Sequence, residues 1–483
     1  MRLKNLVYAS SLLVSAQLIS LACSFLRNVV VAREISVADF GIAAALAATL
    51  AFVEMASAIS VDKILLQDPD GESDLMLGAA HFMSILRGLI IGALLYLLAW
   101  PITSLFRLHD SLWAFQLLAL IPVITSFKHL DYVVMQRNMD LFPAAINASL
   151  PQALATLLVF PLVYLFPDYR AVLIIIMVIP LFNVVISHIT ARRRYQLFGQ
   201  ITVIIKMFRF AWPLMISGLL LFFVFQGEKI IIGTYYDMTM LGLYSVVFTL
   251  LILPAMMLHR LCNSIALPIV ARSFHDKRSF EATCSYLVTS AILLSAIAFA
   301  GFISVGPHLL IFIFGEKFSA SLPILPWIAL MVCVRILRIA PSVITLAMAK
   351  PKCELFANLA RLIAIPLCLL AAYLHWPIHA IAAMAFIGEF CALTAAYLFL
   401  DIPFNGRHLA VKSVKPSLLF VIFIVTTLAL SQSVLFNDKI TDGLLATLSA
   451  LVLFFMLCFS IYNSFPEVKQ LIGNLMTRQS AGP

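Results

Sequence analysis

Long runs of apolar residues separated by short polar breaks follow one another along almost the whole chain. A run of about 17 to 25 mostly apolar residues can cross a bilayer as a helix, because a helix satisfies its own backbone hydrogen bonds in lipid. The pattern predicts an all-α polytopic membrane protein with about 14 transmembrane helices. They are expected at residues 6–31, 38–60, 76–100, 111–134, 142–166, 170–191, 208–233, 240–262, 282–305, 322–348, 353–375, 378–400, 416–434 and 443–463.

Composition places the chain in the same class. Apolar residues make up 63% of its 483 residues and charged residues 11%, and the mean hydropathy is +1.05. Soluble domains are far more polar. The first 23 residues have the charged start and apolar run of a signal peptide, but the apolar run continues beyond them. We therefore interpret this segment as a retained first helix.

The net charge of +9 is distributed as a topology signal. With the N-terminus inside, most Lys and Arg residues fall in inner loops, as the positive-inside rule requires, and both termini are expected in the cytoplasm. The outer exceptions are Arg27, Arg33, Arg107, Arg170, Lys229, Lys317 and Lys439. Trp100, Trp113, Trp327 and Trp376 fall at outer helix ends, where an aromatic belt belongs. The basic charge therefore does not indicate nucleic-acid binding.

A weak internal repeat is visible. Residues 25–50 align without gaps on residues 226–251, an offset of 201, and residues 136–142 resemble residues 350–356, an offset of 214. Two matches in the same order favour duplicated halves, although apolar helices also resemble one another by chance. Parallel repeats of this kind form transporters whose substrate site lies at the interface of the repeats.

The repeat predicts four regions. An N-lobe of helices 1 to 6 covers residues 1–191, and a basic cytoplasmic linker covers residues 192–207. A C-lobe of helices 7 to 12 covers residues 208–400, and residues 401–483 add helices 13 and 14 and a cytoplasmic tail.

Motifs for covalent chemistry are missing. The chain has no P-loop, HExxH, GxSxG or EF-hand pattern, and none of its eight cysteines lies in a CxxC pair. We therefore expect no enzyme activity, no cofactor and no metal site.

Some charged residues lie well inside predicted spans. Arg87, Arg335, Arg338 and Arg361 belong to no loop, and Glu54 and Glu389 lie well inside predicted helices 2 and 12. An arginine at a helix centre costs about 2.5 to 3.5 kcal/mol on insertion scales, so these residues should face a partner or a cavity. One interpretation is that the arginines pair with Glu54 and Glu389 between helices.

The alternative is an anion site, because four arginines outnumber two acids. At an effective dielectric constant of about 20 and a separation of about 5 Å, each unit-charge pair contributes roughly 3 kcal/mol. A diphosphate that contacts two or three arginines could thus offset their insertion cost, and the guanidinium fork suits phosphate geometry.

Three stretches resemble a known family. They are "REISVADFGIAAALAATLAFVEMASAIS" (33–60), "FRFAWPLMISGLLLFFVFQGEKIIIGTYYDMTMLGLYSVVFTL" (208–250), and "IFGEKFSASLPILPWIALM" with "AMAKPKCELFANLARLIA" (313–364). They are similar to the bacterial polysaccharide transporter family, the O-antigen and exopolysaccharide flippases of the multidrug/oligosaccharidyl-lipid/polysaccharide exporter superfamily. The resemblance covers about residues 5–400.

The resemblance implies two lobes around a cationic cavity, alternating access, and transfer of undecaprenyl-pyrophosphate-linked oligosaccharides across a bacterial inner membrane. It also implies coupling to an ion gradient, as in an antiporter. The expected partners are this lipid-linked oligosaccharide, membrane lipid, and polymerase and export proteins of polysaccharide biosynthesis. Substrate-binding candidates are Arg27, Arg87, Lys229, Arg335, Arg338, Arg361, Gln17 and Asn28, and ion-coupling candidates are Glu54, Glu389 and Glu228.

Three other functions remain open. A multidrug exporter of the same superfamily would have an acidic cavity, whereas helix 1 offers Arg27. A lipid II flippase is the second alternative. A membrane glycosyltransferase or ligase is the third, and it would need a large outer loop or a clustered acidic site.

Overall fold

The computed structural model describes residues 3–56, 61–274 and 276–400, and these residues form helices and no strands. They divide into two compact units. Unit 1 comprises Met1–Thr249, Ile313–Ala320 and Ala372–Trp376. Unit 2 comprises Leu250–Phe312, Ser321–Ala371 and the described residues from Pro377 onward.

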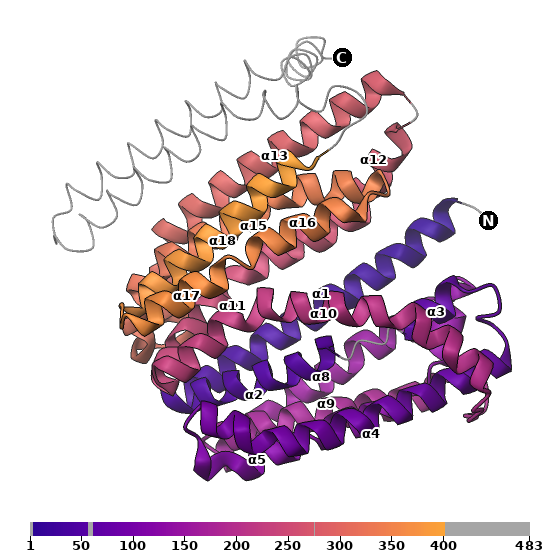
Figure 1. The fold of residues 1–483 in the computed structure, drawn as a ribbon, viewed down its shortest axis with the longest axis horizontal. Helices are drawn as coiled ribbons and strands as arrows, with labels where there is room; N and C mark the ends of the chain where they lie inside the picture. Colours follow the sequence, from indigo (N-terminus) through magenta and orange to yellow (C-terminus); the bar gives the residue numbers. More distant parts are fainter. Residues whose placement is uncertain (1–2, 57–60, 275, 401–483) are drawn as a thin grey trace, which may run out of the picture. The chain divides into compact units, whose positions relative to one another are not determined.

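The helices follow one another with short connections (Figure 1). Those before the linker are α1 (Leu3–Glu34), α2 (Val37–Ala56), α3 (Val61–Gln67), α4 (Asp74–Leu105), η1 (His109–Ser111), α5 (Leu112–Leu117), α6 (Leu120–Ser126), α7 (Asp131–Arg137), α8 (Phe142–Leu165) and α9 (Tyr169–Thr190). Those after it are α10 (Ile201–Tyr235), α11 (Met238–Leu261), η2 (Cys262–Ala266), α12 (Leu267–Ser273), α13 (Lys277–Ser304), α14 (Gly306–Phe314), η3 (Glu316–Ile324), α15 (Leu325–Ala347), α16 (Pro351–Arg361), α17 (Ala364–Tyr373) and α18 (Ile378–Leu398).

The described residues include ten helices that are long and apolar enough to cross a membrane, or eleven if one bent pair is a single span. The all-α prediction is confirmed, and each of the first twelve predicted spans has a helical counterpart. The counterpart of the second, α2, is too short in its apolar part to count among the ten. The predicted helices at 416–434 and 443–463 lie outside the described residues.

The predicted continuous helix at 111–134 is wrong. The chain forms η1, α5 and α6 there, and α7 follows at an angle of 51° to them. At the break, the backbone N–H of His129 donates to Ser187 Oγ (2.9 Å) and that of Leu130 donates to His81 Nε2 (3.1 Å). Side chains of other helices thus satisfy backbone groups that a continuous helix would have paired internally. The predicted span at 353–375 corresponds to Lys352–Tyr373, which is long and apolar enough to cross a membrane, with a two-residue turn between α16 and α17.

Residues 191–200 belong to unit 1 and are held there by hydrogen bonds, whereas residues 201–207 of the predicted linker form the first two turns of α10. Asp131 Oδ2 accepts from the backbone N–H groups of Arg192 (2.8 Å) and Arg193 (3.1 Å). His129 donates from Nε2 to the Arg193 carbonyl (3.1 Å), while its Nδ1 accepts from the N–H of Asp131 (3.2 Å). This arrangement needs a neutral imidazole, because only that form has both a donor and an acceptor nitrogen.

Equivalent helix ends support the predicted repeat at its first match. Ser36 Oγ accepts from the N–H of Asp39 at the start of α2, and Asp237 Oδ1 accepts from the N–H of Met240 at the start of α11. Helices α1 and α10 end at Glu34 and Tyr235. All of these positions differ by 201 residues, so the two copies form the same helix–turn–helix.

The second predicted offset is wrong by one helical turn. Arg137 and Ala347 end α7 and α15, and each is followed two residues later by a left-handed residue, Met139 (φ 65°) or Ala349 (φ 54°). These turns differ by 210 residues rather than the predicted 214.

The two copies of the first turn also touch each other inside unit 1. A Cβ placed on Gly41 would lie 1.8 Å from the carbonyl oxygen of Met238, and one on Gly242 would lie 2.2 Å from that of Val37. Residues 41 and 242 are equivalent in the repeat, and so are residues 37 and 238. The contact is therefore nearly two-fold symmetric, and it requires glycine at both positions.

Candidate functional site

Three arginines of unit 2 surround one carboxylate. Arg335 of α15 donates from Nε to Glu389 Oε1 of α18 (2.7 Å), and Arg361 at the end of α16 places Nη2 2.9 Å from the same oxygen. Arg338 of α15 lies farther away, with Nε 3.9 Å from Glu389 Oε2. Glu389 is fully buried and Arg361 is 2% exposed. The arrangement follows from sequence, since Arg335 and Arg338 are three residues apart on one helix face.

A second carboxylate lies on the other side of Arg338. Arg338 donates from Nη1 to Asn358 Oδ1 (2.9 Å) and lies 3.9 Å from Glu354 Oε1. Glu354 also accepts from Ser342 Oγ (2.7 Å), and Ser342 lies one turn after Arg338 on α15. Three arginines thus share Glu389 and Glu354, and one positive charge is in excess. We call these five residues the arginine cluster.

The excess charge determines what the arginine cluster can bind. Ion pairs offset much of the desolvation cost of buried guanidinium groups. A cluster of three arginines and two glutamates still has one surplus positive charge, which favours an anion. Arg335 and Arg338 keep 13% and 10% of their side-chain surface exposed. A phosphate group could therefore approach these two side chains.

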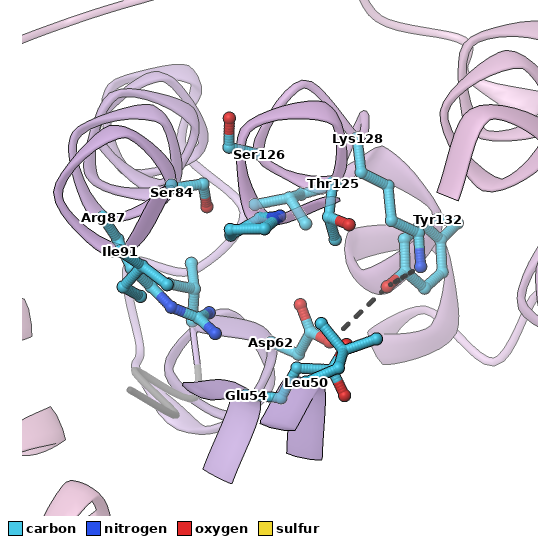
Figure 2. Close-up of a pocket in the computed structure, with 14 residues that line it drawn as sticks. Leu50, Glu54, Asp62, Ser84, Arg87, Ile91, Thr125, Ser126, Lys128 and Tyr132 are labelled. Atoms are coloured by element: carbon cyan, nitrogen blue, oxygen red, sulfur yellow. Dashed lines mark hydrogen bonds between the residues drawn. The ribbon is translucent and has the colours of Figure 1, made fainter. Parts of the chain in front are cut away.

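Unit 1 contains a cavity of about 270 Å³ with charged walls. Figure 2 shows Glu54 of α2, Asp62 of α3 and Arg87 of α4 around a common space, with Lys128 and Tyr132 on the opposite wall. Lys128 Nζ donates to Tyr132 OH (3.0 Å), and the distance from that OH to Asp62 Oδ2 is 3.5 Å. The hydroxyl-bearing residues Ser84, Thr125 and Ser126 complete the polar lining. We call this space the charged cavity.

The charged cavity owes its place to close packing of α4 and α6. A Cβ on Gly88 would lie 2.5 Å from Ser126 Cβ, and one on Gly92 would lie 2.8 Å from the Ala119 carbonyl oxygen. Small residues four apart let two helices approach closely in a membrane. The break after α6 then turns Lys128 toward Asp62 and Arg87.

Arg27 of α1 donates hydrogen bonds to neutral groups. Every acceptor that the structure assigns to it is a carbonyl, amide or hydroxyl oxygen. It donates from Nη2 to Gln152 Oε1 (2.6 Å), and from Nη1 to the Gln152 carbonyl (2.9 Å) and to Thr156 Oγ1 (3.1 Å). The side chain is 8% exposed. Its charge is therefore buried against dipoles of α8 rather than against an acid.

The remaining candidates lie apart from these groups. Glu228 is buried and accepts from Tyr244 OH (2.6 Å), while Lys229 lies over the ring of Phe248, 4.9 Å from its centroid. On α1, Gln17 is exposed and Asn28 is half-buried. No group of three His, Cys, Asp or Glu side chains in the described ranges could hold a metal ion.

The structure places most of the predicted site residues in two separate groups rather than in one site. Arg335, Arg338 and Arg361 lie together with Glu389, and Arg87 shares the charged cavity with Glu54. Sequence reasoning missed Glu354, Asn358, Asp62, Lys128 and Tyr132. Asn358 and Glu354 lie one and two turns before Arg361 in "KPKCELFANLAR", so their spacing was a usable signal. Lys128 was concealed inside the wrongly continuous span.

Comparisons with known proteins agree on family and fold. Residues 30–323 match the family described as polysaccharide biosynthesis protein. The solved structure of the lipid II flippase MurJ in an inward closed conformation is similar, with a TM-score of 0.67 and 14% identity over 93% of this chain and 98% of that one.

Multidrug transporters share the fold. An inward-facing MATE family transporter of the MOP superfamily has a TM-score of 0.61 and 13% identity over 80% of this chain and 94% of its own. The Vibrio cholerae MATE transporter VcmN, solved as a mutant, has a TM-score of 0.56 and 13% identity over 84% of this chain and 98% of its own. No curated protein sequence matches the chain.

Proposed function

Because the chain belongs to the polysaccharide biosynthesis protein family, we propose that it is a flippase for lipid-linked oligosaccharides. It moves undecaprenyl-pyrophosphate-linked repeat units from the cytoplasmic to the periplasmic leaflet of a bacterial inner membrane, for exopolysaccharide or O-antigen assembly. Its fold is that of multidrug transporters and a lipid flippase, which supports transport without covalent chemistry.

The arginine cluster is the observation on which the proposal rests. Arg335, Arg338 and Arg361 lie in helices that cross the membrane, where insertion of each costs about 2.5 to 3.5 kcal/mol. Glu389 and Glu354 offset part of this cost and leave one positive charge in excess. A diphosphate head group supplies the missing negative charge, and its oxygens match the guanidinium fork.

Transport follows alternating access, and the contact between Gly41 and Gly242 is the outer junction that must open. Two short segments of unit 1 that come from the second half of the chain reinforce this end. Lys317 Nζ donates to the carbonyl oxygen of Arg33 (2.8 Å), and Tyr236 OH donates to that of Trp376 (2.5 Å). Lys317 Nζ also donates to the Ile35 carbonyl (2.5 Å). All of these acceptors are neutral, so opening the junction breaks a small number of hydrogen bonds and no ion pair among them.

The membrane potential favours this direction of movement. An inside-negative potential drives an anion outward with about 2.3 kcal/mol per charge per 100 mV. Glu54, Glu389 and Glu228 remain the candidates for an ion-coupling carboxylate. Of the three, Glu54 lines a cavity, whereas arginines enclose Glu389.

The central test removes the exposed part of the arginine cluster. The double variant Arg335→Ala/Arg338→Ala should abolish surface polysaccharide in cells that depend on this protein, because the diphosphate loses its contacts. The triple variant that also carries Arg27→Ala should likewise lack surface polysaccharide. Immunoblots of membranes check that the variants insert. Arg170→Ala, which removes an exposed arginine paired with Asp168, is the matched control and should export normally. Wild-type polymer from the double variant would reject an anion site at these residues.

The junction has its own test. Gly41→Val or Gly242→Val should hold the outer ends apart and reduce export at least tenfold, because the added Cβ overlaps a carbonyl oxygen. Labelling of a cysteine placed at Phe40 by a membrane-impermeant maleimide should increase in parallel. Gly301→Val is the control, since a Cβ at that position meets nothing within 4 Å. Unchanged labelling and export in both glycine variants would show that this contact does not gate transport.

A further inference from the structure

The charged cavity differs from an anion site because its formal charges cancel. Glu54 and Asp62 contribute two negative charges, and Arg87 and Lys128 contribute two positive ones. We infer that this cavity binds one neutral monosaccharide residue of the lipid-linked substrate, an inference that rests on the proposed flippase function.

Charged ligands fit the charged cavity poorly. A diphosphate near Glu54 and Asp62 would meet like charges, and each such pair is unfavourable by roughly 3 kcal/mol at about 5 Å and a dielectric constant of about 20. An organic cation meets the same difficulty with Arg87 and Lys128. A neutral ligand leaves the four charges balanced, so its binding requires no new charge in the membrane.

Sugar hydroxyl groups suit this lining. Each hydroxyl donates one hydrogen bond and accepts others, so a ring that carries several can donate to the carboxylates and accept from the cations. Hydrogen bonds to charged groups are about twice as strong as neutral ones. Ser84, Thr125 and Ser126 add hydroxyls that can serve in either sense, and Leu50 and Ile91 offer apolar surface to the C–H faces of a ring.

The existing contacts leave room for such a ligand. Lys128 is held over the ring of Tyr132, 4.4 Å from the centroid, and donates to its hydroxyl. The contact from Tyr132 OH to Asp62 Oδ2 is long, at 3.5 Å, and is readily replaced by a ligand hydroxyl. Figure 2 shows the carboxylates and the guanidinium group turned into the same space.

The volume limits the size of the ligand. The cavity of about 270 Å³ is slightly smaller than the roughly 300 Å³ at which pockets for drug-sized molecules begin. It therefore accommodates one sugar ring and not a chain of several. The remaining sugars of a repeat unit would extend beyond it.

The test compares two probes on the full-length protein in nanodiscs. One is undecaprenyl diphosphate without sugar, and the other is the same lipid carrying glucose, galactose or N-acetylglucosamine. Wild-type protein should bind at least one sugar-bearing lipid about tenfold or more tightly than the bare lipid, which corresponds to one or two hydrogen bonds to charged groups. Asp62→Asn should reduce this preference to less than about threefold and leave bare-lipid binding unchanged. Glu54→Gln, on a different helix, is the second variant in case Asp62→Asn does not fold.

Controls separate this inference from the proposed function. Asp70→Asn removes an exposed carboxylate outside the cavity and should keep the full preference. Wild-type protein that binds bare and sugar-bearing lipids equally would overturn the sugar site and leave the flippase proposal intact. Equal loss of both lipids in Asp62→Asn would also overturn it, because the cavity would then serve the head group. Failure of the wild type to bind either the bare or the sugar-bearing lipids would overturn both proposals.

Discussion

The arginine cluster of unit 2 and the charged cavity of unit 1 use the same residue types in opposite ways. In the cluster, Glu389 is fully buried in contact with Arg335 and Arg361, and three arginines share two acids. In the cavity, two acids and two cations face about 270 Å³ of space that side chains do not occupy. The first is a packed site with surplus charge, and the second is an open site without it.

This difference separates two consequences of charge in a membrane. A packed ion pair contributes to stability through its geometry, and removal of one partner leaves the other uncompensated. Charges around a solvent-accessible space are hydrated already and contribute to recognition rather than to folding. Substitutions that neutralise a charge should therefore lower the free energy of unfolding more in the arginine cluster than in the charged cavity.

The largest effect is expected from Glu389→Ala. The substitution removes the carboxylate that Arg335 and Arg361 contact at 2.7 and 2.9 Å, and leaves their charges buried together. Loss of one member of a buried ion pair typically costs about 3 to 5 kcal/mol. Denaturant titration of the purified protein in detergent measures the change.

Glu354→Ala is the matched control within the cluster. Glu354 is 28% exposed and lies 3.9 Å from Arg338, so its removal should cost under about 1 kcal/mol. Equal destabilisation by both variants would contradict the central place given to Glu389. A stability change below about 1 kcal/mol for Glu389→Ala would remove the contrast between the two sites.

Sequence reasoning found the cluster more readily than the cavity, and the reason is physical. Arg335 and Arg338 stand out because an uninterrupted apolar helix surrounds them, and their spacing of three places them on one face. Glu389 is equally isolated in its span. The pairing between them was one of two open interpretations, and the structure contains both the pairing and the excess charge.

The cavity could not be assembled in the same way. Its residues come from five separate helices, and the position of Lys128 depends on a break that the apolar run from 111 to 134 conceals. Local pattern specifies which face of a helix is polar, but helix-to-helix contacts determine which polar faces meet. Arg87 and Glu54 were predicted individually, whereas Asp62 and Tyr132 were not predicted at all.

An intermediate effect is expected from Arg27→Ala, which tests a third type of site in which a buried arginine has neutral partners. The substitution leaves Gln152 Oε1 and Thr156 Oγ1 without the donor Arg27, while the Gln152 carbonyl keeps its hydrogen bond from Thr156 Oγ1 (2.7 Å). Buried groups that lose a hydrogen-bond partner typically cost about 1 to 3 kcal/mol. The expected destabilisation is therefore smaller than that of Glu389→Ala and is measured in the same titration.

A double-mutant cycle with Gln152→Ala controls for indirect effects of Arg27→Ala. The two substitutions should not be additive, because they remove the same interaction. Additive losses would mean that Arg27 is stabilised elsewhere. Arg27 would then not be a buried arginine whose charge is stabilised by these neutral hydrogen-bond partners alone.

The smallest effect is expected from Glu54→Gln, because the charged cavity already solvates its carboxylates. The substitution keeps the shape of the side chain and removes one charge from a wall that faces open space. It should change the free energy of unfolding by less than about 1 kcal/mol, while Glu389→Gln in the packed cluster should cost several times more. A large loss for Glu54→Gln would mean that the cavity walls form a folding element, and the division between a packed anion site and an open site for a neutral ligand would no longer hold.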